Sequence, residues 1–211
     1  MRLPLRLIFS VLFISLQSIA ARAEITLDYL IFDDSIPFHL KILDAIPREG
    51  KIQVGPDNAK NTIIEFFDYF CGYCKKIHPE LIDLAKSNND LRVIFIQHPI
   101  LNESSNVLAK IAIAATMQNK GFELHHSLFS LEGSITAEKL QQAIKEIGLN
   151  EVKLKIDMER DEVKKIIKLS SFLASGAGAR GTPAIFINEE FIGGYLSQER
   201  IKGLLKSKET P

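Results

Sequence analysis

Four short segments of the chain have the apolar character that is typical of strands. The β-branched and aromatic run from Thr62 to Phe67 and the run from Leu91 to Gln97 each have the length and composition of a buried strand. Two further segments, Pro183 to Asn188 and Glu190 to Tyr195, follow each other closely near the end of the chain. Their spacing predicts the two strands of a hairpin.

Elsewhere, apolar residues recur every three to four positions, which predicts helices. One helix is expected after the first strand and ends before the turn residues 88–90. The longest helical region covers about 103–175. Within it, Thr136 is expected to cap the start of a helix that ends near Ile147. A last helix is expected from about Ser197.

The order of these elements is strand, helix, strand, helical block, hairpin and helix. Strands that alternate with helices predict an α/β fold in which helices flank a central sheet. The helical block at about 103–175 falls between the second and third core strands. We interpret this block as an insertion that covers one side of the sheet.

The N-terminus has the pattern of a secretory signal. Arg2 and Arg6 precede an apolar run over residues 7–21, and Ala21-Arg22-Ala23 matches a signal-peptidase site. The run is shorter than the roughly 20 apolar residues of a membrane-spanning helix. We therefore predict a signal peptide over residues 1–23, cleaved after Ala23, with an uncleaved anchor as the alternative.

The remaining chain has the size of one domain. Residues 24–55 are expected to form a lead segment with a short helix at 36–45, and residues 56–211 to form the domain itself. The chain carries 26 basic and 26 acidic residues, and the signal carries three arginines and no acid, so the mature net charge is −3. Without basic clusters, no nucleic-acid or anionic-lipid partner is predicted. The oligomeric state stays open.

The chain has two cysteines, Cys71 and Cys74. A bridge over two intervening residues hardly constrains the unfolded chain, so reactivity explains the pair better than stability does. At a helix N-terminus, unpaired N–H groups and the helix dipole lower the pKa of a thiol. Cys71 is therefore expected to attack, and Cys74, one turn further along, to resolve the mixed disulfide.

Two metal-based interpretations compete with this one. A C-x-x-C pair is also half of a zinc site, and His78 follows at helical spacing, but a structural zinc needs four ligands. The other histidines show no ligand spacing with the pair: His39, His98, His125 and His126. Haem attachment needs a histidine at position 75, which is Lys75. No metal or other cofactor is expected. A zinc-stabilised or chaperone-like binding module remains the alternative from another class.

The stretch from Phe66 to Pro79, F-F-D-Y-F-C-G-Y-C-K-K-I-H-P, resembles the active site of thioredoxin-fold proteins. Its aromatic approach and the large helical insert are more specifically similar to the DsbA family, over roughly 61–205. This resemblance implies a thioredoxin-like fold, a periplasmic location and dithiol–disulfide exchange with exported proteins. It also implies a membrane redox partner.

Two positions near the cysteines match the family pattern. Glu65 lies six residues before Cys71, where the family carries a buried acid that moves the proton of the resolving cysteine. The alternative is a glutamate that faces water on an edge strand. Pro79 marks a kink in the family's active-site helix, although taken alone it could end that helix early.

The resemblance also assigns a substrate-binding group. In Gly181-Thr182-Pro183 the family has a cis peptide bond before the proline, and the residue before it offers backbone groups to an extended substrate. Tyr73, between the cysteines, is assigned to substrate binding together with Thr182 and Pro183.

The direction of electron flow is open. The strongest oxidants of the family carry Pro-His between the cysteines, whereas this chain carries Gly72-Tyr73, which supplies no positive charge. Asp68 is expected to add a field that opposes the thiolate. We predict an oxidase that introduces disulfides into exported proteins, with a reductase or isomerase as the alternative.

Overall fold

A mixed sheet runs through the protein, whose computed structural model describes residues 35–207. Within these residues the sheet has five strands in the order β1-β3-β2-β4-β5. Strands β2 and β3 are parallel, and the other neighbours are antiparallel. The strands are β1 (Lys51–Val54), β2 (Asn61–Phe67), β3 (Leu91–Gln97), β4 (Ala184–Ile187) and β5 (Glu190–Gly193). The expected signal peptide and the lead segment up to residue 34 lie outside the described residues.

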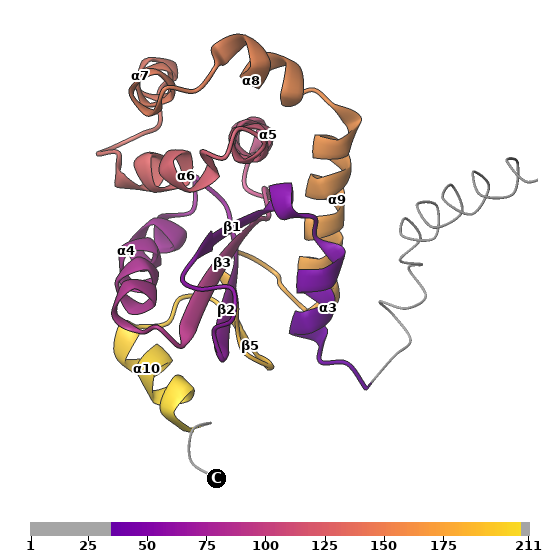
Figure 1. Cartoon of the computed structure of the whole chain (residues 1–211), viewed down its shortest axis with the longest axis vertical. Helices are drawn as coiled ribbons and strands as arrows, with labels where there is room; N and C mark the ends of the chain where they lie inside the picture. Colours follow the sequence, from indigo (N-terminus) through magenta and orange to yellow (C-terminus); the bar gives the residue numbers. More distant parts are fainter. Residues whose placement is uncertain (1–34, 208–211) are drawn as a thin grey trace, which may run out of the picture. The chain divides into compact units, whose positions relative to one another are not determined.

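Helices cover both faces of the sheet (Figure 1). On one face lie α4 (Gly72–Ser87) and α10 (Gln198–Ser207), and on the other lie α3 (Phe38–Ala45) and α9 (Asp161–Gly176). The remaining helical elements are η1 (Arg48–Gly50), α5 (Glu103–Thr116), α6 (Gly121–Ser130), α7 (Ala137–Ile147) and α8 (Glu151–Asp157). Helices α5 to α9 all fall between β3 and β4. The predicted thioredoxin-like α/β fold, with an insertion between the second and third core strands, is confirmed.

Strand β2 occupies the centre of the sheet and is buried at every position. Successive side chains of a strand point to opposite faces, so a strand that is covered on both faces reads as a continuous apolar run. Ile63 and Phe67 pack in the core on the α4 side, whereas Ile64 and Phe66 pack in the core beneath α3 and α9. Glu65 has the same parity as Ile63 and Phe67. Its side chain therefore points toward the α4 side, where the cysteines lie.

The segment expected to lead into the domain contributes to the sheet. Strand β1 pairs antiparallel with β3, with Lys51 opposite Ile96 and Val54 opposite Val93. The sheet therefore begins before residue 56. After β1 the chain turns at Gly55, which has a φ of 94°, and a Cβ there would lie 2.3 Å from the carbonyl oxygen of Leu91. Glycine is required at this position both by the backbone conformation and by the close contact.

Several local predictions agree with the observed helix boundaries. The hydroxyl of Thr136 accepts the N–H of Lys139 and caps α7. Pro79 lies inside α4, which continues to Ser87, so the proline does not end the helix. Among the described residues, no helix combines the length and apolar character that crossing a membrane requires.

Candidate active site

Cys71 is the N-cap residue of α4. Its backbone is extended, with φ −82° and ψ 114°, and its sulfur accepts the N–H of Cys74 at 3.4 Å. The side chain that fills an N-cap position lies among the unpaired N–H groups of the first turn, at the positive end of the helix dipole. A thiolate is therefore stabilised at this position more than a neutral thiol is.

The environment lowers the pKa of Cys71 to about 5. The largest cause is a hydrogen bond with the Cys74 side chain. Partial burial opposes it, and smaller contributions come from Thr182 and from the backbone N–H groups of Cys74 and Tyr73. Free cysteine has a pKa near 8.5, so Cys71 is largely a thiolate at neutral pH in the reduced protein.

Cys74 has the opposite character. Its side chain is fully buried, whereas that of Cys71 keeps 7% of its surface exposed. Burial raises the pKa of Cys74 far above its usual range, and the neighbouring Cys71 and Glu65 raise it further. The two sulfurs thus differ in both access and acidity, as an attacking and a resolving cysteine must.

Glu65 lies beneath the pair, with 1% of its surface exposed. Burial raises the pKa of its carboxyl well above the usual value, although a hydrogen bond with Cys74 opposes this effect. That contact is loose, since neither carboxyl oxygen has a partner at normal hydrogen-bonding geometry. The glutamate therefore does not face water, and its carboxyl lies next to the buried Cys74 thiol.

The acidity of Cys71 gives a measurable pH profile. In the reduced protein, the alkylation rate of Cys71 by iodoacetamide is expected to be near its maximum at neutral pH and to fall as the pH drops through about 5. Cys74 should stay unmodified over this range, since it is buried and protonated. Mass spectrometry of peptides quenched at each pH measures both rates. A midpoint near 8.5 would show that the helix terminus does not stabilise the thiolate.

The loop before β4 reaches the same sulfur. The Thr182–Pro183 peptide bond is cis, and the Cys71 sulfur lies 3.1 Å from the carbonyl oxygen of Thr182, to which its protonated form donates a hydrogen bond. The structure therefore brings together residues that are 111 positions apart. Tyr73 projects outward, with 61% of its surface exposed, and its ring centroid lies 6.0 Å from that of Tyr195.

Asp68 organises the loops around Cys71, a role that the sequence did not suggest. Its buried carboxylate accepts hydrogen bonds from groups on three short segments: the N–H groups of Phe70, Ile100 and Leu101 and the hydroxyl of Ser105. Its own carbonyl oxygen accepts the N–H of Cys71 at 3.0 Å. The carboxylate thus ties the loop after β3 and the start of α5 to the approach to the cysteines. The sequence feature that could have indicated this role is an acidic residue directly after a predicted buried strand.

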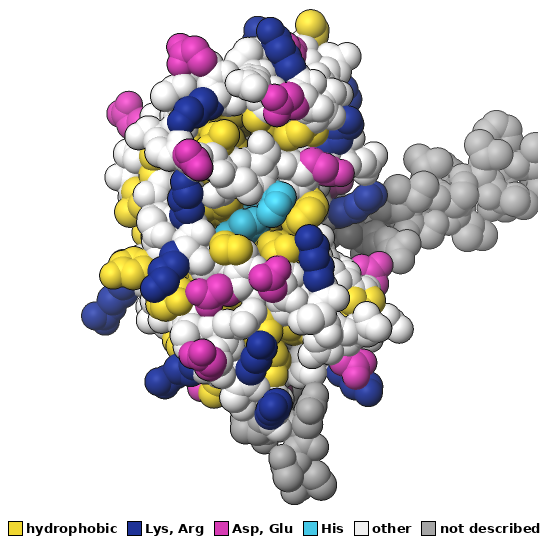
Figure 2. All heavy atoms as spheres, turned by 90° about the vertical axis from the view of Figure 1, so that its left-hand side faces the viewer, with side chains coloured by type: hydrophobic (Ala, Val, Ile, Leu, Met, Phe, Trp, Pro, Cys, Tyr) yellow, Lys and Arg dark blue, Asp and Glu magenta, His cyan; other side chains and the backbone are white. Residues whose placement is uncertain are grey.

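Three histidines form contacts between α4 and the helical insert. Nε2 of His78 and Nδ1 of His126 lie 3.0 Å apart, and the Tyr69 hydroxyl lies 3.2 Å from Nδ1 of His125. Burial lowers the pKa of His78 to about 3 and that of His125 well below its usual value, so both are neutral. Figure 2, which faces this side, shows histidines at its centre among apolar side chains. Across residues 35–207, no group of three or more potential ligand side chains is arranged to hold a metal ion.

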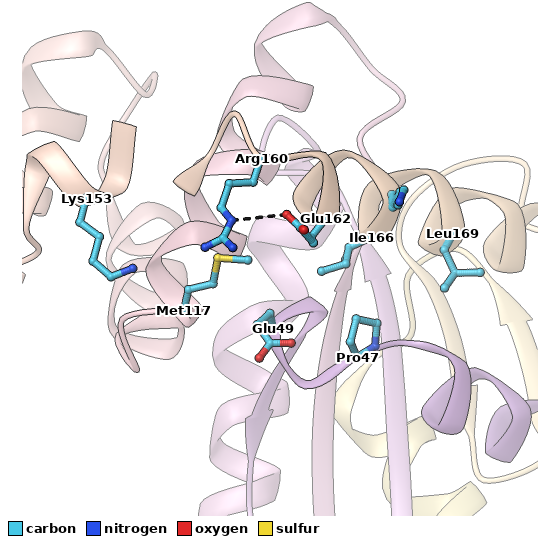
Figure 3. A pocket seen from close by; sticks show the side chains of 9 residues that line it. Pro47, Glu49, Met117, Lys153, Arg160, Glu162, Ile166 and Leu169 are labelled. Carbon is cyan, nitrogen blue, oxygen red and sulfur yellow. Dashed lines mark hydrogen bonds and ion pairs between the residues drawn. The ribbon is translucent and has the colours of Figure 1, made fainter. Parts of the chain in front are cut away.

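One hollow in the protein surface lies away from the cysteines. It has a volume of about 570 Å³ and is lined by residues of η1, α8 and α9, including Glu49, Lys153 and Ile166 (Figure 3). Arg160 at its rim is paired with Glu162 and with Asp157. In the described part of the chain, no cysteine, serine, threonine or histidine lines this hollow, so no nucleophile of this kind is placed in it.

Fold and site together define a class of protein. A helix that begins at a C-x-x-C pair, opposite a cis-proline loop on a mixed sheet, is the arrangement of thioredoxin-fold thiol–disulfide oxidoreductases. A thioredoxin family model matches residues 48–207, and the chain belongs to this family.

Known proteins agree with this assignment. A thioredoxin-like oxidoreductase from Silicibacter pomeroyi is 28% identical, with a TM-score of 0.72, covering 77% of this chain and 94% of that one. The thiol-disulfide exchange protein alpha-DsbA2 from Wolbachia pipientis is 25% identical, with a TM-score of 0.69, covering 85% and 90%. The resemblance to the DsbA family is confirmed.

Curated sequences match over part of their length. A protein disulfide-isomerase from Aspergillus oryzae is 28% identical over 144 residues, which are 63% of this chain and 28% of that protein. Sodium/proton antiporters match over 21% to 25% of their length. The chain thus spans about a quarter of the length of the curated relatives it matches.

Proposed function

We propose that this protein is a periplasmic thiol–disulfide oxidoreductase that forms disulfide bonds in exported proteins by exchange at Cys71 and Cys74. The observation that carries the proposal is the difference between the two sulfurs: Cys71 has a pKa of about 5, and Cys74 is buried with a raised pKa. A stabilised thiolate favours the reduced state of the pair. The Cys71–Cys74 disulfide is therefore readily transferred to substrate thiols, which it oxidises.

In the oxidising direction, a substrate thiolate attacks the sulfur of Cys71, and the Cys71–Cys74 bond breaks. Cys74 leaves with the electron pair and takes a proton that the carboxyl of Glu65 supplies. A second substrate thiolate then attacks the substrate sulfur of the mixed disulfide and releases Cys71 as a thiolate. The substrate is released with a new disulfide bond, and Cys71 and Cys74 remain reduced.

Substrate binding is assigned to Thr182, Pro183 and Tyr73. The backbone of Thr182 lies beside the reactive sulfur and can pair with an extended substrate segment, as in strand addition. The exposed ring of Tyr73 adds apolar contact area on the surface next to Cys71. A membrane protein that accepts electrons would restore the disulfide after each cycle. Export depends on the predicted signal peptide, cleaved after Ala23.

A reductase or isomerase kept reduced is the second candidate. It is supported by Tyr73, which supplies no positive charge beside the thiolate, and by Thr182 before the cis-proline. The similarity to a protein disulfide-isomerase points the same way.

The reduction potential distinguishes the two candidates. Thioredoxin lies near −270 mV and DsbA near −120 mV, and the pKa of the attacking cysteine is about 7 in thioredoxin and about 3.5 in DsbA. With a pKa of about 5 at Cys71, we expect a potential between these limits, which equilibration with glutathione measures. Tyr73→His should raise it. A potential at or below that of thioredoxin would refute the oxidase and favour the reductase.

A further inference from the structure

A small hollow lies on the insert side of Cys71. It has a volume of about 220 Å³ and is bounded by the start of α4 and by the segment between α6 and α7. The residues that matter for its chemistry are Tyr69, Phe70, Cys71, Lys75, Leu128 and Ile135. Because Cys71 forms part of its wall, a substrate bonded to this residue lies beside the hollow.

We propose that this hollow is a subsite that binds one apolar side chain of the substrate polypeptide, next to the cysteine that reacts with Cys71. This inference rests on the proposed function, because it requires a polypeptide joined to Cys71. The subsite is formed jointly by the thioredoxin-like part and the helical insert. It would select substrates by the residues that flank their cysteines.

The position of the hollow relative to Thr182 supports this occupant. Thr182 lies 3.1 Å from the Cys71 sulfur but does not line the hollow. An extended segment that pairs with the Thr182 backbone directs successive side chains to opposite sides. Side chains next to the reacting cysteine therefore point alternately toward and away from the insert. Residues of a strand are about 3.3 Å apart, so those within two positions of the cysteine can reach the hollow.

The lining selects for apolar side chains. Tyr69 is held in place by its neighbours, since its ring centroid lies 5.0 Å from that of Phe67 and 5.2 Å from that of Phe129. Leu128 and Ile135 add aliphatic surface from the insert. A preformed apolar hollow gains free energy from each apolar atom that it removes from water.

Lys75 makes the subsite selective against cations. Its ammonium group donates a hydrogen bond to the carbonyl oxygen of Leu131, which holds the positive charge at the wall of the hollow. A lysine or arginine of the substrate would meet this charge at short range, where like charges repel each other. The predicted order of preference is therefore leucine or phenylalanine over alanine, and alanine over lysine.

Single-cysteine peptides capped with nitrothiobenzoate test the proposal on the reduced mature chain. Cys71 attacks the peptide sulfur, and nitrothiobenzoate leaves as a coloured thiolate, which gives the second-order rate constant directly. Leucine, alanine and lysine are compared at each of the two positions on either side of the cysteine. At one of these positions we expect the leucine peptide to react about tenfold faster than the lysine peptide, at the low end of what an apolar pocket discriminates.

Two substitutions should remove this preference. Ser134 lines the hollow and is exposed, so Ser134→Trp should fill the space and bring the leucine-to-lysine ratio close to one. Lys75→Glu should raise the rate of the lysine peptide relative to that of the leucine peptide. Matched controls are Ser175→Trp on α9 and Lys86→Glu at the far end of α4, both exposed, and both should keep the wild-type ratio. The ratio cancels any change in the reactivity of Cys71 itself.

The outcomes distinguish a failure of the proposed function from a failure of the subsite proposal alone. If the wild type reacts with none of the capped peptides, the proposed function fails. If it reacts with all of them at equal rates, the function stands and the subsite is refuted. A preference that persists in both Ser134→Trp and Ile135→Ala would place the selectivity elsewhere, and circular dichroism of each variant verifies that it is folded.

Discussion

Replacing Cys74 by serine is expected to convert the protein from a catalyst into a trap for its substrates. Cys71 keeps its place at the start of α4, so it still attacks a substrate disulfide and forms a mixed disulfide. The second sulfur that would release this intermediate is missing. Covalent complexes should therefore accumulate, visible on non-reducing gels and by mass spectrometry, while turnover in an insulin-reduction assay falls to the uncatalysed rate.

Cys71→Ser should give the opposite picture, with loss of turnover and no complexes. Cys74 is fully buried, and its raised pKa leaves no thiolate to attack at neutral pH. The double variant is the control for thiol-independent background. If Cys74→Ser turns over like the wild type, or if complexes form through Cys74 in the Cys71→Ser variant, the assignment of roles is wrong.

The central strand and the reactive helix could be predicted because their signals are local. The run from Thr62 to Phe67 is apolar on both of its alternating faces, at Ile63 and Phe67 and at Ile64 and Phe66, which predicts burial on both sides, and β2 is buried throughout. The C-x-x-C spacing placed Cys71 at a helix N-terminus without any knowledge of the fold. The period of two along β2 also fixes the side on which Glu65 lies.

Other features depend on contacts that no local pattern encodes. Strand β1 was missed because it is a four-residue edge strand with one fully buried position, so its apolar signal is weak. The bonds from Asp68 to Ile100 and Leu101 span more than 30 positions. The contact of Cys71 with Thr182 spans 111 positions. These depend on how the strand ends meet at one edge of the sheet, which is known only once the strand order is known.

The histidines illustrate the same limit. Adjacent residues on a helix point about 100° apart, so His125 and His126 are expected to face different environments. The structure does bury the first and expose the second. It also places both rings against His78, with ring centroids 4.8 Å and 5.3 Å away, a contact between α4 and α6 that spacing alone could not reveal.

Glu65→Gln is expected to slow the exchange step at Cys74 by about 100-fold while the fold is retained, since a positioned general acid or base contributes on the order of 10²–10⁴ in rate. The amide has the size of the carboxyl but cannot exchange a proton with the Cys74 thiol. Attack by Cys71 on a substrate does not need Glu65, so the first step should keep its rate. Stopped-flow measurement of formation and decay of the mixed disulfide separates the two steps.

The pH dependence of protein stability tests the same substitution independently of the kinetics, because the pKa of Glu65 is raised by burial in the folded state. In the unfolded chain this carboxyl ionises near pH 4.3. The contribution of Glu65 to wild-type stability should therefore fall as the pH rises from about 4.3 toward its folded pKa, since only the unfolded chain releases this proton over that range. Glu65→Gln should lack this loss and be more stable than the wild type at pH 8 in urea unfolding.

Glu190→Gln, at an exposed position of β5, serves as the matched control and should change neither the kinetics nor the pH dependence. If Glu65→Gln leaves both the decay rate and the pH dependence of stability unchanged, Glu65 neither moves the proton of Cys74 nor has a pKa raised by burial.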